Sequence, residues 1–255
     1  MIIKTAYALP FRVTYPTKPF FSSGGAASLV VQLSKDSGAD HISETIRRFV
    51  DLANTGALAG STIEPWRSGL AATTSMTVGP RRVSQIIDTC AIDDTSLVVL
   101  CDLLQHEGAA GYVEELEITR EGSTRQILRS EQDSFSTMPE RFQKIPFPIE
   151  DEQPECGTYS FELSLSRPLI DLERTTLRAA LNIWTTAVLA GAFALAPIPP
   201  ADNYAEIDGP PIEYDSTLEW SVFKLRAAPA AIDCLINIFA AFHSRCCPIK
   251  ELIIS

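Results

Sequence analysis

Positive charge is scarce in this sequence. The chain carries 21 lysine and arginine residues against 32 aspartate and glutamate residues, which gives a formal net charge of −11 at pH 7. A nucleic-acid surface needs a basic patch that displaces counterions from phosphates. The composition therefore argues against DNA or RNA as a partner, whereas an acidic protein attracts basic ones.

The chain also lacks the short motifs of familiar active sites. It has no G-x-S-x-G elbow, no G-x-G-x-x-G loop and no Walker lysine motif. Its six cysteines form no C-x-x-C pair, and none stands at metal-ligand spacing from the three histidines. We therefore predict no metal and no cofactor, and we favour binding over catalysis.

A secretion signal is missing from the first residues as well. A lysine at position 4 and a proline at position 10 interrupt the apolar stretch that such a signal needs. Cys90, Cys101 and Cys234 fall within apolar runs, where a reduced thiol acts as a small hydrophobic side chain. We expect a reducing, cytoplasmic environment.

What the chain does contain is an internal repeat. Residues 40–60 and 171–191 align in one register, with Asp40 opposite Asp171, Arg47 opposite Arg178, and a Leu-Ala-Gly ending in both copies. Ile42, Ile46, Phe49, Val50 and Ala53 recur at helical spacing in the first copy, and Asp40 is placed to cap it. Both segments are predicted to be long helices.

The elements around these helices predict the fold class. The expected order in the first repeat is strand 28–34, helix 40–60, hairpin 73–78 and 82–90, helix 95–106 and strand 113–119. The expected order in the second is strand 160–166, helix 171–192, hairpin 204–208 and 217–225 around a Gly-Pro-Pro turn, helix 229–243 and strand 249–254. This predicts an α+β fold made by duplication of a ferredoxin-like β-α-β-β-α-β unit, with antiparallel sheets and helices packed on one face.

We expect three regions along the chain. Residues 1–119 form the first repeat with an N-terminal strand extension, and residues 159–255 form the second. Residues 120–158 are a proline-rich acidic connector, in which residues 124–130 are β-prone and the prolines argue against a helix.

One apolar segment raises the question of a membrane span. Residues 179–197 contain no charged side chain over about the length that crosses a bilayer. The matching segment of the first repeat, however, carries Arg48, Asp51 and Asn54. A membrane span in one copy and a water-soluble helix in the other would break the fold that the two copies share. We predict a helix buried between the halves or in a homo-oligomer interface, and no membrane contact.

The strongest functional signal is an acidic stretch in the second repeat. No lysine or arginine occurs between Arg178 and Lys224, while acids and aromatic residues alternate there. Acidic side chains steer a basic partner and aromatic ones anchor it; the alternative is a solvated loop and hairpin. The predicted partner-binding residues are Asp202, Tyr204, Glu206, Asp208, Glu213, Tyr214 and Asp215, joined by Glu150, Asp151 and Glu152 if the connector folds beside them.

Three functions are open at this point. The first is a cytoplasmic protein that captures a basic partner, most concretely an immunity protein that neutralises a bacterial toxin. The second is an enzyme or small-molecule binder that uses the cleft between the repeats, with His106 and His243 as the first residues to test. The third is a structural or assembly subunit.

Overall fold

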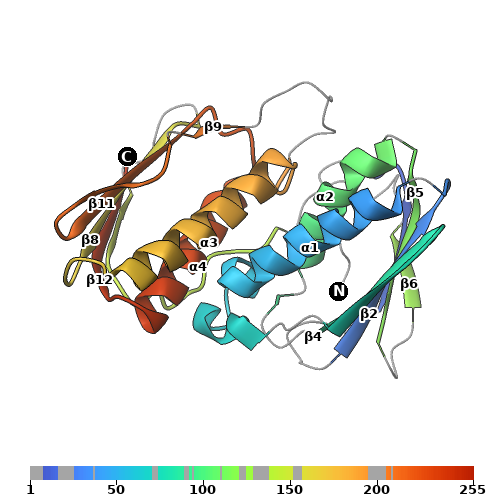
Figure 1. Ribbon diagram of the computed structural model, residues 1–255, viewed down its shortest axis with the longest axis horizontal. Helices are drawn as coiled ribbons and strands as arrows, with labels where there is room; N and C mark the ends of the chain where they lie inside the picture. Colours follow the sequence, from blue (N-terminus) through green and yellow to red (C-terminus); the bar gives the residue numbers. More distant parts are fainter. Residues whose placement is uncertain are drawn as a thin grey trace.

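The computed structural model describes residues 8–16, 26–36, 38–70, 74–88, 92–93, 95–109, 111–120, 125–128, 138–151, 157–194, 205–207 and 209–255. Within these ranges the protein is a mixed α+β fold with two β-sheets and four α-helices. The two sheets lie on the outside and the helices lie between them (Figure 1). None of the helices in these ranges combines the length and apolarity needed to cross a bilayer.

The first half contains one sheet and two α-helices. Its elements are β1 (Arg12–Pro16), β2 (Ala26–Leu33), α1 (Ala39–Thr55), the 3-10 helices η1 (Ala57–Ala59) and η2 (Pro65–Leu70), β3 (Thr74–Gly79), β4 (Arg82–Asp88), α2 (Ser96–Ala109), β5 (Val113–Thr119) and β6 (Arg125–Leu128). The strand order is β3-β4-β2-β5-β1-β6. The pairing of β1 with β5 is parallel, and the other pairs are antiparallel.

The second half also contains one sheet and two α-helices. Its elements are β7 (Ile149–Asp151), β8 (Tyr159–Leu165), α3 (Asp171–Leu189), β9 (Glu206–Ile207), β10 (Ile212–Tyr214), β11 (Thr217–Phe223), α4 (Ala230–Arg245) and β12 (Ile249–Ile254). The strand order is β10-β11-β8-β12-β7, and β9 also pairs with β11. As β1 does beside β5, the short strand β7 lies parallel to β12.

Several helix and turn boundaries differ from those predicted from the sequence. Helix α1 begins at Ala39 and makes no side-chain cap bond, so Asp40 lies in the first turn rather than capping it. The helix ends at Thr55 because Gly56 adopts φ 98°, a left-handed conformation that glycine tolerates. In the second half the tight hairpin turn lies between β10 and β11, where Asp215 has φ 56°, and not at Gly-Pro-Pro.

The two halves pack through their helices. Helix α3 contacts α1, and α4 contacts η1 and η2. In α3 the side chains of Trp184, Ala187 and Val188 are buried, and Trp184 packs within the second half against Trp220. Ala179, Asn182 and Leu189 of the same helix are exposed, so the uncharged segment is buried along one side only.

A single buried amide joins three chain segments at this contact. Asn237 of α4 is fully buried. Its Oδ1 accepts a hydrogen bond from the Phe142 N–H at 2.8 Å, and its Nδ2 donates to the carbonyl oxygens of Ala57 and Glu140, each at 3.3 Å. The helix is thereby fixed to the end of α1 and to the segment that precedes β7.

Candidate functional site

The structure places the predicted partner-binding residues on two different edges of the second sheet. Asp202, Tyr204, Asp208 and Glu152 lie outside the described residues. Glu213, Tyr214 and Asp215 lie on β10 and the turn that follows it, at one end of β11, while Glu206 of β9 lies along the same edge at the other end of β11, opposite Phe223. Glu150 and Asp151 lie on β7, which is at the opposite edge of the sheet. The connector therefore does not extend the β10 edge.

Two of the acids at the β10 edge already have partners. Glu213 accepts hydrogen bonds from Arg174 of α3 at 2.6 and 3.1 Å, and the hydrogen bond from Arg174 is the main cause that lowers the pKa of Glu213. The Glu206 carboxylate is 2.6 Å from Lys224 Nζ. Glu213 thus fastens the edge strand to a helix, while Tyr214 is 59% exposed and open to contact.

A second set of acidic residues lies on the outer face of the second sheet, the face away from the helices. The sequence analysis predicted only part of this set. Successive side chains of a strand point to opposite faces. Leu218, Trp220 and Leu163 are buried on the helix side, so Glu219 and Glu162 point outward. The set consists of Glu150 on β7, Glu162 on β8, Glu219 on β11 and Glu251 on β12, and we call it the acidic face.

The strand register brings these four residues into neighbouring rows. Glu219 is opposite Glu162, Glu162 is opposite Ile253, and Ile253 is opposite Glu150. Glu251 is opposite Ser164 in the next row. The sequence analysis did not predict Glu162 and Glu251, because each is an isolated acid in its strand, within SFELSLS and IKELII. Strand pairing is what places them on the same face of the sheet.

The acidic face is not neutralised within the described part of the chain. None of its four carboxylates has an ion pair among the described residues, although Lys250 stands at the bulge before Glu251. Like charges directly opposite each other in a sheet repel. Ile212, which is 53% exposed, lies opposite Glu219 at the edge of this face. The result is an open, negatively charged surface with apolar groups at one border.

The candidate His243 has a structural role, and so does Trp220, an aromatic residue within the acidic stretch. Trp220 is buried and packs edge-on against Trp184 with ring centroids 5.8 Å apart, so it belongs to the core. His243 Nδ1 accepts a hydrogen bond from the Ile249 N–H at 3.0 Å and thereby positions the start of β12. His106 is exposed on α2, in the other half.

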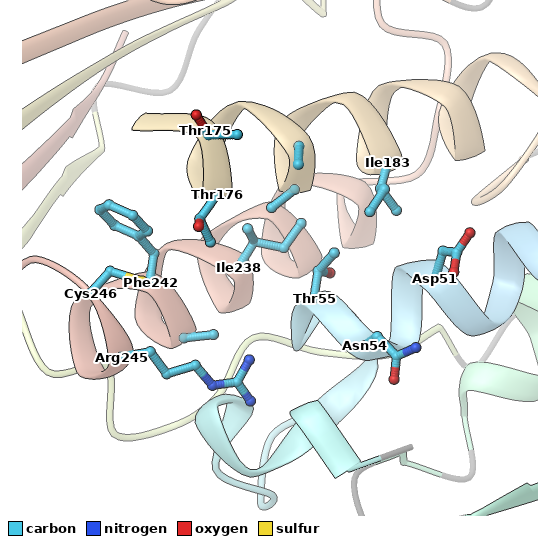
Figure 2. Close-up of a pocket in the computed structure, with 13 residues that line it drawn as sticks. Asp51, Asn54, Thr55, Thr175, Thr176, Ile183, Ile238, Phe242, Arg245 and Cys246 are labelled. Atoms are coloured by element: carbon cyan, nitrogen blue, oxygen red, sulfur yellow. The ribbon is translucent and has the colours of Figure 1, made fainter. Parts of the chain in front are cut away.

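The structure also contains a pocket between the two halves (Figure 2). It has a volume of about 420 Å³ and is formed by α1, α3, α4 and the residue after α4. Its lining residues are Asp51, Asn54, Thr55, Thr175, Thr176, Ala179, Ala180, Ile183, Ile238, Ala241, Phe242, Arg245 and Cys246. Burial raises the pKa of Asp51, and the nearby Arg47 opposes that shift.

The chemistry of the cysteines and of possible metal ligands is limited. Cys101 and Cys234 are fully buried, and burial raises the pKa of both thiols. In the described ranges no three histidine, cysteine, aspartate or glutamate side chains gather as a metal site would require.

Comparison with known proteins gives no relative on which to base a function. No protein-family description matches the chain, and no curated protein matches it. Among solved structures, a DyP-type peroxidase from Cellulomonas bogoriensis aligns over 90% of this chain and 88% of its own, with 12% identity and a TM-score of 0.19. A similarity of that size supports no argument about this chain.

Proposed function

We propose that the protein binds a basic protein partner through the acidic face, most concretely as an immunity protein that neutralises a bacterial toxin in the cytoplasm. The observation that supports this most is the set of four carboxylates on one open sheet face with no ion-pair partner among the described residues. The repulsion among them is relieved when cationic side chains approach.

Charge and exposed apolar groups have separate parts in this proposal. Carboxylates on the sheet raise the rate of encounter with a cationic protein and select against acidic ones. Tyr214 and Ile212, at the border of the acidic face, supply the apolar and aromatic contact that holds a partner after encounter. A toxin that cleaves nucleic acid has a cationic site that binds the phosphates of its substrate. The carboxylates of the acidic face would bind to that site and block it.

We infer further that the two halves are copies of one ferredoxin-like unit, within residues 1–119 and 159–255, joined by the connector 120–158. In support, β2-α1-β3-β4-α2-β5 and β8-α3-β10-β11-α4-β12 have the same element order, and their strands the same spatial order. The acidic face belongs to the second copy, whereas Glu115 on β5 of the first copy is paired with Arg12.

The test is affinity capture from the source cells with three tagged proteins. One is the wild type, and the second has Glu150, Glu162, Glu219 and Glu251 each changed to Gln. The third, a control, loses four charges elsewhere through Asp40→Asn, Glu107→Gln, Glu114→Gln and Glu140→Gln. We expect one stoichiometric basic protein to bind to the wild type and the control, and at least about tenfold less of it to bind to the acidic-face variant.

Two results would contradict the proposal. The first is a partner that the acidic-face variant and the control retain equally. The second is a wild-type protein that captures no basic protein at moderate salt.

A further inference from the structure

The pocket between the halves has the composition of a small-molecule site. Its volume of about 420 Å³ lies within the ~300–1,000 Å³ that is usual for ligand pockets, and such pockets have mostly apolar walls with a few polar groups. Here Ala179, Ala180 and Ile183 of α3 form one wall, and Ile238 of α4 adds to it. Because α1 belongs to the first half, the pocket exists only when both halves are packed together.

Most of the polar groups in the pocket are already occupied. Thr55, Thr175 and Thr176 donate their hydroxyl hydrogens to the backbone carbonyls of Leu52, Asp171 and Leu172. Arg245 donates through Nε to the carbonyl oxygen of Trp66 at 2.9 Å. These donors are directed at the backbone, while the threonine oxygens can still accept a hydrogen bond from a ligand.

Asp51 differs from these groups. Its carboxylate makes no hydrogen bond and no ion pair with another described residue, although Arg47 and Glu44 are close enough to affect it. Figure 2 shows Asp51 of α1 across from Ile183 of α3, with Asn54 beside it and Arg245 on the other side of the pocket. A partly buried carboxylate next to an apolar wall is best compensated by a cation that donates hydrogen bonds.

We propose that this pocket binds a small amphipathic amine, with its ammonium group on the Asp51 carboxylate and its alkyl part along Ala179, Ala180 and Ile183. Asn54 lies one helical turn further along α1 and offers a side-chain amide oxygen as a second acceptor. The net charge of −11 raises the local concentration of cations around the protein and disfavours carboxylate ligands. This site is on the helix side of the second sheet, so it is separate from the acidic face.

The experiment compares three six-carbon probes by isothermal titration calorimetry at pH 7.5 on the full chain. The probes are hexylamine, hexanol and hexanoate, which have the same alkyl part and differ in the head group. We expect hexylamine to bind saturably and hexanoate to bind most weakly. Asp51→Asn is expected to weaken hexylamine by about tenfold or more, the effect of losing one charge-assisted hydrogen bond, and to leave hexanol unchanged.

Two further variants make the result specific. Glu114→Gln removes one exposed negative charge on β5, outside the pocket lining, and is expected to bind hexylamine as the wild type does. Ala180→Phe fills the pocket and is expected to abolish binding of all probes, with circular dichroism confirming that it is folded. Equal weakening by Asp51→Asn and Glu114→Gln, or the absence of saturable hexylamine binding, would overturn the proposal.

Discussion

At the scale of single residues, the buried side chain of Asn237 links α4 to two other segments of the chain. Every polar atom of its amide is engaged with backbone groups from two other segments, Ala57 on one side and Glu140 and Phe142 on the other. A buried donor or acceptor that loses its partner costs about 1–3 kcal/mol. Removing this amide leaves three such backbone groups to find new partners.

We therefore expect Asn237→Ala to lower the free energy of unfolding by about 2–4 kcal/mol. Urea unfolding at pH 7, followed by circular dichroism, measures this loss. Asn182→Ala is the matched control, because Asn182 is exposed on α3, and a change within about 0.5 kcal/mol is expected there. Similar losses in both variants would show that the amide network is not what holds α4 in place.

At the scale of elements, the edge strand β10 depends on α3. Arg174 donates to Glu213 of β10, and it also donates to the carbonyl oxygen of Leu169, just before the helix. The strand is three residues long and pairs only with β11 among the described strands. The ion pair therefore adds to the pairing with β11 in keeping this edge, with Tyr214 on it, in one position.

The same ion pair predicts a dependence of stability on pH. Because Arg174 lowers the pKa of Glu213, its stabilising effect is fully present above the unfolded-state pKa of glutamate, about 4.3, and is lost as the pH falls through the lower folded-state value. Glu213→Gln is expected to lose less stability than the wild type between pH 5 and pH 3 in urea unfolding. Glu206→Gln, which removes the exposed pair with Lys224, should keep the acid sensitivity of the wild type.

Elements also show how far sequence reasoning reached. The mixed α+β class and the β-prone segment at residues 124–130, which contains β6, followed from periodicity and composition. Strand β7 did not, because three residues, IED, carry no periodic signal and are ordered by pairing with β12. The candidate site was found only partly for the same reason: Glu162 and Glu251 become neighbours of Glu219 through strand pairing, which single-sequence patterns do not contain.

At the scale of the whole molecule, the placement of charge opposes the stability of the fold. The helices of the two halves cover each other, so both sheets turn their outer faces to the surroundings (Figure 1). On the second sheet that outer face carries Glu162 directly opposite Glu219, an arrangement that destabilises a sheet. The cost of this repulsion depends on salt, which screens it.

We expect the acidic-face variant, with its four glutamates changed to glutamine, to be more stable than the wild type by on the order of 0.5–1 kcal/mol at 10 mM salt. Raising the salt to 0.5 M should stabilise the wild type more than the variant, because salt screens the repulsion that the variant lacks. Thermal unfolding at both salt concentrations provides the comparison. The control variant with four charges removed elsewhere should keep the salt response of the wild type.

The position of β12 has a mechanical consequence. This strand lies between β8 and β7 and is hydrogen-bonded on both sides, and beyond it Ser255 exchanges two backbone hydrogen bonds with Ser160. A force that pulls on Ser255 along the strand loads both ladders in shear, so many bonds must break together. A fibre or surface attached at Ser255 would therefore pull on the second sheet in the direction in which it resists force most. The same force applied to β10 would peel one short strand from the edge.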